Sequence, residues 1–265
     1  MLINNTLFFV ENHEVENPKA TVIITHGIAE HSGRYLKIVE QLNQNGYRVV
    51  RYDLRGHGQT EGPRGKIKNY KQPIEDLHAI VMSVKNKFDL PVYLLGHSMG
   101  GLIVDMYGVT YHDVDGIIAS AAASYYVKDV APFKLIGYKW LSFVKLKTNF
   151  ADHKLSTIRE VEQRYIEDPL NLKYYYVSLA GGMMLGGVRY LNKNIEHFNT
   201  PILILHGGKD EIVPPAFSKR FFDLIQVEDK EIKFYNQSLH EILNDVEQEE
   251  VRNDIVAWLD KRVKA

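Results

Sequence analysis

A serine flanked by glycines, at the boundary between a strand pattern and a helix pattern, constrains the fold of this chain more than any other feature. Residues 91–95 form a short apolar run that predicts a buried strand, and residues 101–107 have the pattern of a helix. Between them lies Gly96-His97-Ser98-Met99-Gly100, the pattern of a nucleophile elbow, a sharp turn that presents a serine hydroxyl above a strand end. Ser98 is therefore the candidate nucleophile. The N–H of Met99, at the helix N-terminus, is a candidate donor to a developing oxyanion.

An acid and a base follow Ser98 along the chain, each in a loop after a strand pattern. Residues 201–206 predict a buried strand, and Asp210 follows it. Residues 232–235 predict a last strand, and His240 lies in the loop before a C-terminal helix pattern. Ligand chemistry in open α/β sheets is found at the carboxyl ends of strands, and the order Ser, Asp, His is that of the α/β-hydrolases. We expect His240 to accept the Ser98 proton and Asp210 to orient His240.

Other residues compete for the roles of acid and base. Glu211 adjoins Asp210, but its side chain is expected to point elsewhere. His97 adjoins the candidate nucleophile, yet successive side chains diverge at such a turn, so a packed or hydrogen-bonded histidine is the simpler interpretation. His206 ends a strand pattern and is expected to satisfy loop backbone. The remaining histidines are scattered without metal-ligand spacing such as His-Glu-x-x-His, so we expect no metal site.

A second backbone donor to the oxyanion is expected from the loop after an earlier strand. Residues 21–25 form a β-branched run that ends just before Gly27, and glycine allows a close backbone approach. We therefore assign this donor to the N–H of Ile28, with a plain strand-to-helix turn as the alternative. The next strand pattern leads into residues 53–58, where we expect Asp53 to hold the turn through side-chain hydrogen bonds. The loop lacks the Gly-Lys-Ser/Thr ending of a phosphate loop.

Four separate blocks of this sequence together resemble the monoacylglycerol lipase and lysophospholipase branch of the α/β-hydrolase superfamily, the serine aminopeptidase S33-like group. The blocks are residues 26–35 (HGIAEHSGRY), 53–58 (DLRGHG), 96–101 (GHSMGG) and 239–241 (LHE). The resemblance covers nearly the whole chain apart from the segment near 125–197. It implies a serine esterase that acts on single-acyl lipids. It carries the catalytic roles to Ser98, Asp210 and His240, and the oxyanion donors to Ile28 and Met99.

Composition excludes several classes of function. The 265 residues carry a formal net charge of −1, which argues against a nucleic-acid partner. The chain has no cysteine, so it has neither disulfides nor thiol chemistry. Its first residues lack the basic and apolar regions of a signal peptide, and no window approaches the roughly 18 apolar residues of a transmembrane helix. We expect a cytoplasmic protein that needs no metal or organic cofactor; the oligomeric state stays open.

Strand and helix patterns alternate along most of the chain. Strands are expected near residues 7–11, 21–25, 47–52, 92–95, 116–120, 202–206 and 232–235, and helices near 34–45, 73–88, 100–111, 216–226 and 245–263. Such alternation predicts an α/β fold with a mostly parallel central sheet and helices on both faces. We expect residues 1–124 and 198–265 to form this α/β-hydrolase core, and residues 125–197 to form a helical cap inserted into it.

The expected cap contains an apolar pattern at helical spacing, with lysines beside it. The apolar residues are Phe133, Ile136, Trp140, Leu141 and Val144, and the lysines are Lys134, Lys139, Lys145 and Lys147. A helix packed over an apolar pocket explains this pattern, and so does a basic amphipathic helix that makes transient contact with a membrane surface. The run 178–187, rich in glycine and methionine, is expected either to line an acyl channel or to act as a hinge.

The function expected from these features is ester hydrolysis through an acyl-enzyme, with a small-molecule ester or single-acyl lipid, monoacylglycerol first, as substrate. A lysophospholipase, a short- or medium-chain carboxylesterase or a peptidase would use the same three residues. A non-catalytic binding protein on a hydrolase fold is the alternative of another class. Glu30 and Arg34 are four residues apart, so they form either an ion pair or contacts with a polar head group such as glycerol.

Overall fold

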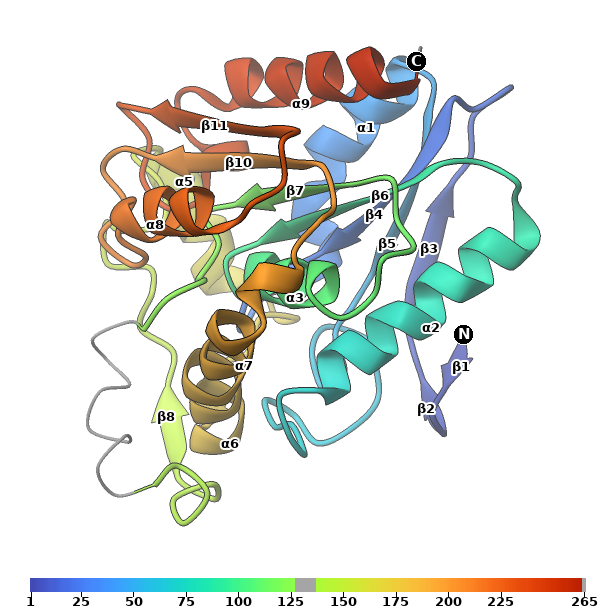
Figure 1. The fold of residues 1–265 in the computed structure, drawn as a ribbon. Coiled ribbons are helices and arrows are strands. Elements are labelled where there is room, and N and C mark those ends of the chain that lie inside the picture. Colours follow the sequence, from blue (N-terminus) through green and yellow to red (C-terminus); the bar gives the residue numbers. More distant parts are fainter. Residues whose placement is uncertain (127–136, 264–265) are drawn as a thin grey trace.

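A seven-stranded, mostly parallel sheet forms the centre of the computed structural model, which describes residues 1–126 and 137–263 (Figure 1). The strands lie in the order β11-β10-β7-β6-β4-β5-β3, and among them only β3 and β5 pair antiparallel. Their bounds are β3 (Val10–His13), β4 (Ala20–Thr25), β5 (Tyr47–Tyr52), β6 (Val92–His97), β7 (Gly116–Ser120), β10 (Ile202–Gly207) and β11 (Lys230–Tyr235).

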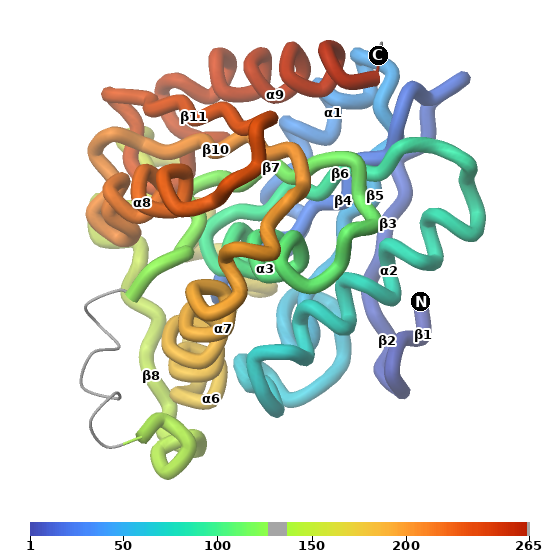
Figure 2. The backbone as a smooth tube through the Cα atoms, viewed as in Figure 1, coloured from blue at the N-terminus to red at the C-terminus, as the bar shows by residue number. Residues whose placement is uncertain are grey.

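Helices cover both faces of this sheet, as the predicted α/β-hydrolase fold requires. Two lie together on one face, α1 (Leu36–Gln44) and α9 (Gln248–Val263) (Figure 2). The opposite face carries α2 (Gln72–Lys87), α3 (Met99–Gly108) and α8 (Ala216–Leu224) (Figure 1). Because the central strands are buried on both faces, they are continuous apolar runs rather than alternating ones.

The sheet places two loops with candidate functional residues side by side. Strands β4 and β6 are neighbours, with Thr25 opposite Gly96, although β5 and α2 separate them in the chain. After β4 the next strand, β5, is added on one edge side of the sheet, whereas after β6 the next strand, β7, is added on the other. The direction of strand order therefore reverses between β4 and β6. Crevices for ligands open at such reversal points, at the carboxyl ends of the strands. Here these ends lead to Gly27 and to Ser98.

The predicted first strand, 7–11, is wrong in its bounds and its pairing. Two short strands, β1 (Leu2–Ile3) and β2 (Thr6–Leu7), form a separate hairpin, and β3 begins only at Val10. The reason is that the backbone at residues 8 and 9 bonds outside the sheet. The N–H of Phe8 donates to the Met1 carbonyl and that of Phe9 to Thr60 Oγ1. The other six predicted strands and the five predicted helices are confirmed within a few residues at their ends.

The expectation that residues 125–197 contain helices without strands is also wrong. Strands β8 (Lys145–Lys147) and β9 (Tyr174–Tyr176) form an antiparallel pair within this segment. The helix expected over residues 133–144 is not formed in its described part: residues 137–143 are turns, and Gly137 has a φ of +83°, which a helix does not accommodate. Phe133, Lys134 and Ile136 lie outside the described residues.

The segment also contains helices, joined by loops and turns. Its helices are α5 (Arg159–Glu167), α6 (Val177–Gly181), the π-helical turn η3 (Gly182–Gly187) and α7 (Val188–Lys193). Met183 and Met184 are buried in the main hydrophobic core with α3. Three short 3₁₀ turns complete the described elements: η1 (Ser32–Tyr35), η4 (Ile195–His197) and η5 (Ile242–Asn244). None of the helices in residues 1–126 and 137–263 has an apolar stretch long enough to span a bilayer.

Candidate active site

Ser98 occupies a strained turn between β6 and α3. Its φ is +55° and its ψ −116°, a conformation that costs a non-glycine residue about 1–3 kcal/mol. Close backbone packing maintains the turn: a Cβ on Gly100 would lie 2.1 Å from the Thr25 carbonyl oxygen, and one on Gly96 would lie 2.3 Å from the Gly100 oxygen. The predicted elbow geometry is therefore present, because only glycine fits at either position.

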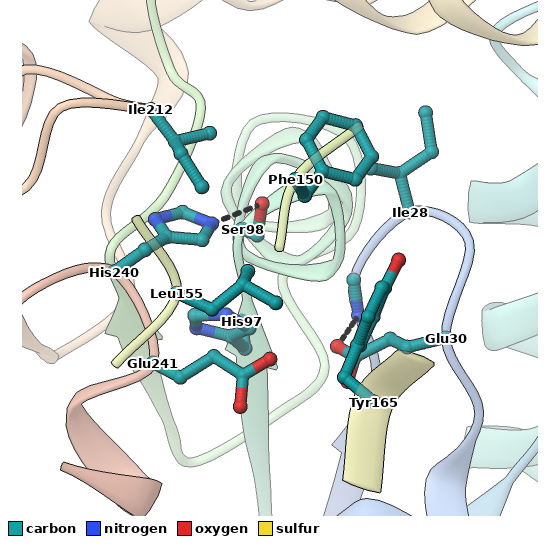
Figure 3. Close-up of a pocket in the computed structure, with 11 residues that line it drawn as sticks. Ile28, Glu30, His97, Ser98, Phe150, Leu155, Tyr165, Ile212, His240 and Glu241 are labelled. Carbon is teal, nitrogen blue, oxygen red and sulfur yellow. Dashed lines mark hydrogen bonds between the residues drawn. The ribbon is translucent and has the colours of Figure 1, made fainter. Parts of the chain in front are cut away.

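The imidazole of His240 connects Ser98 to Asp210. His240 Nε2 lies 2.9 Å from Ser98 Oγ (Figure 3). On the other side of the ring, His240 Nδ1 lies 2.7 Å from Asp210 Oδ2. An ionised carboxylate only accepts hydrogen bonds, so Nδ1 carries the proton and Nε2 is free to accept the Ser98 hydroxyl. The three side chains come from the loops after β6, β10 and β11 and are all buried. The tertiary structure thus brings together the three residues that the sequence pattern selected.

The carboxylate of Asp210 is held from two sides. The N–H groups of Ile212 and Val213 each donate to Oδ1 at 2.9 Å, and His206 Nε2 lies 3.1 Å from Oδ2. Burial alone would raise the pKa of Asp210, but His240 and the hydrogen bond from His206 outweigh it and hold this pKa well below its usual range. Asp210 is therefore ionised throughout the neutral range.

The pKa of His240 is shifted in the opposite direction to that of Asp210. Burial lowers the pKa of His240, but the nearby Asp210 carboxylate, and then Glu241 and Glu30, more than compensate and raise it above the ordinary value of 6.5. The imidazole is therefore a stronger proton acceptor than a histidine in water. It is neutral, and able to accept a proton from Ser98, only above this raised pKa.

The loop after β4 approaches Ser98 at Gly27. A Cβ on Gly27 would lie 3.2 Å from the Ser98 Cβ and 2.8 Å from Glu30 Oε1, so a larger residue would displace the loop. The Gly27 N–H donates to Glu30 Oε1 at 2.6 Å (Figure 3). Within the described part of the chain, the N–H groups of Ile28 and Met99 donate no hydrogen bond to another backbone or side-chain group. Both remain free to bind an oxygen next to Ser98.

Glu30 and Arg34 form an ion pair, which supports the first of the two interpretations drawn from their spacing. Arg34 Nε lies 3.1 Å from Glu30 Oε2, and Arg34 Nη2 lies 2.6 Å from Glu241 Oε1. The pKa of Glu30 falls to about 2 because Arg34 and His97 outweigh the effect of burial. The guanidinium also stacks on Tyr165, 4.8 Å from the ring centroid. Sequence reasoning assigned no role to Glu241, although it adjoins the candidate base His240.

The competing residues take other roles. His97 Nδ1 bonds the Ser120 hydroxyl at 3.2 Å, and burial together with His240 lowers the pKa of His97 to about 3, so it is a neutral, packed histidine. His206 bonds the Val213 carbonyl, as expected of a residue that satisfies loop backbone, and also Asp210.

The two competing acids also lie outside the proposed triad. Glu211 is exposed. Asp53 accepts the N–H groups of Ser32 and Gln59 at 2.8 Å each and so holds its turn as expected.

A small hollow with a cavity volume of about 30 Å³ opens beside Ser98. Its walls come from the loop after β4, from the segment 145–197 and from the loops that carry Asp210 and His240 (Figure 3). The lining residues are Gly27, Ile28, Glu30, His97, Ser98, Phe150, Leu155, Tyr165, Ile212, His240 and Glu241. No residue of the run 178–187 is among them. Phe150, Leu155 and Tyr165 carry no sequence signal, because they reach this hollow only through tertiary packing.

The hollow is apolar on one side and polar on the other. Phe150, Leu155 and Ile212 offer hydrocarbon walls, whereas Glu30 and Glu241 offer carboxylate oxygens (Figure 3). No group of three or more histidine, aspartate or glutamate side chains that could hold a metal ion is present in residues 1–126 and 137–263. This arrangement allows Ser98 to attack a carbonyl carbon as a nucleophile. The N–H groups of Ile28 and Met99 can then donate hydrogen bonds to the resulting oxyanion.

Comparison with known proteins places this chain in a sequence family. A model of the family described as "Serine aminopeptidase, S33" matches residues 16–247. The chain is 30% identical to the monoacylglycerol lipase of Mycolicibacterium smegmatis, over 92% of this chain and 89% of that protein. It is 27% identical to Phospholipase YtpA of Bacillus subtilis, over 94% and 98%. The crystal structure of Paleococcus ferrophilus monoacylglycerol lipase is similar with a TM-score of 0.86 and 31% identity, over 97% and 99% of the two chains.

Proposed function

Because this chain belongs to the serine aminopeptidase S33 family of α/β-hydrolases, and is therefore a serine hydrolase, we propose that it cleaves monoacylglycerols with Ser98, His240 and Asp210 as its catalytic triad. The observation that carries this proposal is the continuous hydrogen-bonded series from Asp210 through His240 to Ser98, next to a hollow with hydrocarbon walls. The names of the similar proteins support a lipid ester as the substrate.

The proposed reaction has two halves. In the first, Ser98 Oγ attacks the ester carbonyl carbon while His240 Nε2 accepts the hydroxyl proton, and the N–H groups of Ile28 and Met99 bind the oxyanion. When the tetrahedral intermediate collapses, the ester C–O bond breaks and His240 returns the proton to the leaving glycerol oxygen. In the second half, His240 takes a proton from water, the resulting hydroxide attacks the acyl-enzyme, and the fatty acid leaves as Ser98 is protonated again.

The polar side of the hollow favours a neutral head group. A glycerol hydroxyl can donate to the carboxylate oxygens of Glu30 or Glu241. Arg34 is already engaged by both of these carboxyl groups, so it is not free to bind a phosphate. A lysophospholipid, the substrate class of the alternative function, would place its phosphodiester against this pair of acids. The electrostatics therefore supports monoacylglycerol over lysophospholipid.

We also propose that residues 1–124 and 198–265 act as the catalytic core and residues 125–197 as a cap. Support comes from the described part of that segment, residues 137–197, which adds no strand to the central sheet and supplies Phe150, Leu155 and Tyr165 to the hollow. In this proposal the cap provides the acyl-binding wall, and the core provides the triad and the oxyanion donors.

The substrate proposal is tested with a matched series of lipids. Wild-type protein is assayed on monoacylglycerols and on lysophosphatidylcholines with the same acyl chains, from short to long, by measuring fatty-acid release. We expect kcat/KM at least about tenfold higher for the monoacylglycerol of each pair, the effect of about 1.4 kcal/mol in transition-state binding. Higher activity on the lysophospholipids would overturn the head-group assignment. Turnover of short activated esters alone would overturn the lipid substrate but leave the triad.

The raised pKa of His240 predicts the pH dependence of the reaction. His240 must be neutral to act as a base, so kcat/KM should rise with pH through its pKa and reach half its maximum above pH 6.5. Glu241→Gln removes a negative charge that raises this pKa, so the acid limb should move to lower pH. Glu249→Gln changes an exposed acid on α9 and should leave the limb in place. An unmoved limb in Glu241→Gln would show that this carboxylate does not act on His240.

A further inference from the structure

A second histidine contacts the acid of the proposed triad. His206 lies near the end of β10, four residues before Asp210, and both side chains are fully buried. His206 Nε2 lies 3.1 Å from Asp210 Oδ2 and 2.9 Å from the Val213 carbonyl oxygen. An ionised carboxylate and a carbonyl can only accept hydrogen bonds, so Nε2 carries a proton that it donates to both oxygens.

The other nitrogen of the same ring is held by α8, which packs beside β10 (Figure 1). His206 Nδ1 lies 2.7 Å from the hydroxyl of Ser218, a buried residue in the first turn of that helix. Within residues 1–126 and 137–263 this hydroxyl makes no other hydrogen bond, so its proton is free to turn toward Nδ1. A hydroxyl that donates to Nδ1 polarises the ring and makes its Nε2–H a stronger donor. Ser218 therefore holds the imidazole in place and strengthens its bond to Asp210.

One carboxylate oxygen is thus shared by two imidazoles. Asp210 Oδ2 accepts the Nδ1–H of His240 at 2.7 Å and the Nε2–H of His206 at 3.1 Å. The second oxygen, Oδ1, is occupied by two backbone N–H groups of the loop that follows. Five buried side chains, from Ser218 through the two histidines and their shared acid to Ser98, therefore form one hydrogen-bonded series.

We propose that His206 is a positioning residue of this active site, which keeps Asp210 Oδ2 directed at His240 and takes up part of the negative charge that this oxygen presents to the His240 ring. A carboxylate with fewer hydrogen-bond donors attracts the imidazolium more strongly. Without His206, the neutral form of His240 that accepts the serine proton would therefore appear only at higher pH. His206 itself touches neither the substrate nor the reacting atoms. The inference rests on the proposed function, because it assigns a role within that mechanism.

Titratable groups on other elements also face His240, and substitution of His206 leaves them unchanged. Glu241 adjoins His240, Glu30 comes from the loop after β4, and both raise the pKa of His240. His97 has its ring centroid 4.8 Å from that of His240, and burial lowers its pKa to about 3, so it stays uncharged. No hydrogen bond or ion pair joins these three groups to His206 in the described part of the chain. A change in the titration of His240 then reports the lost bond to the shared carboxylate.

The first test is the pH profile of kcat/KM with p-nitrophenyl butyrate, an activated ester that reports on the triad whatever the lipid preference. His206→Leu removes the donor, so we expect its acid limb to move up by about half a pH unit and its plateau to fall about tenfold. His206→Gln keeps an N–H donor near the position of Nε2, so its limb should lie closer to that of the wild type. Ser218→Ala should move the limb in the same direction as His206→Leu, by a smaller amount.

A direct titration of the His240 ring separates positioning from folding. NMR of protein labelled with ¹⁵N-histidine follows this ring without any substrate, and the urea midpoint of unfolding reports on stability. We expect the pKa of His240 to rise in His206→Leu by the same amount as the acid limb moves. His78→Leu is the matched control, because it makes the same change at a histidine of α2 that bonds Tyr107 and does not line the hollow. Its His240 titration should coincide with that of the wild type.

Three results would count against the positioning role. The first is a lower urea midpoint in His206→Leu with an unmoved His240 titration, which is the behaviour of a purely structural residue. The second is an equal shift in His78→Leu. The third covers a His206→Leu protein that does not fold: Ser218→Ala and His206→Gln then decide, and an unmoved titration in Ser218→Ala overturns the role. If the wild type released no fatty acid from monoacylglycerols while the variants still shifted His240, the proposed function would fail and the positioning role would stand.

Discussion

Ser98→Ala is expected to lower kcat about a million-fold, the largest effect of any substitution considered for this chain. The reason is that Ser98 Oγ is the only group hydrogen-bonded to His240 Nε2 among the described residues, so its loss removes the covalent intermediate altogether. The residual rate above water would come from the oxyanion donors and substrate binding. The measurement is single-turnover release of fatty acid from the best monoacylglycerol.

The same variant distinguishes an enzyme from a non-catalytic binding protein on the same fold. Alanine is isosteric with the serine except for the hydroxyl, and the bonds that hold the turn are backbone bonds, from the Ser98 N–H to the Ser120 carbonyl and from the Leu102 and Ala123 N–H groups to the Ser98 carbonyl. The urea midpoint of unfolding should therefore stay near that of the wild type. A Ser98→Ala protein as active as the wild type would remove the nucleophile assignment, and with it the mechanism.

Asp210→Asn is expected to lower kcat about 10⁴-fold while the protein stays folded. The local hydrogen bonds decide which way the new amide points. The N–H groups of Ile212 and Val213 both donate to Oδ1 and, as backbone donors, can only donate, so the amide oxygen takes that position. The amide NH₂ takes the position of Oδ2, where the hydrogen bond from His206 Nε2 is lost. The NH₂ group then donates to His240 Nδ1, which forces the proton onto Nε2. In that tautomer His240 cannot accept the Ser98 proton.

Glu211→Gln is the matched control for this prediction. It makes the same chemical change one residue further along the loop, on a side chain that is exposed. Its kcat should differ from that of the wild type by less than about twofold, as expected of an exposed surface change. The reverse pattern, a nearly active Asp210→Asn and an inactive Glu211→Gln, would transfer the acid role to Glu211.

Most of the fold and the candidate triad could be predicted from sequence because they depend on local rules. Apolar runs of five or six residues become buried strands, and a serine between two glycines at a strand end has one favourable geometry. Glu30 and Arg34 are four residues apart, and their pairing follows from that spacing. One error lies where distant contacts override the local pattern. Residues 8 and 9 bond Met1 and Thr60 instead of the sheet. The other error is local: residues 137–143, where Gly137 has a positive φ, form turns instead of the helix that the apolar spacing suggested.

The sequence by itself predicted the α/β class from the alternation of strand and helix patterns. It also selected Ser98, Asp210 and His240 as candidates, and Ile28 and Met99 as the proposed oxyanion donors, from short patterns at strand ends. Only the tertiary structure decided which side chains surround them. The bond from Arg34 to Glu241 spans 207 residues of chain, and His206 shares Asp210 with His240 because adjacent strands end at the same edge of the sheet. The structure likewise joins residues near 65, 145 and 175, whose proximity is set by strand pairing and packing rather than by any local preference.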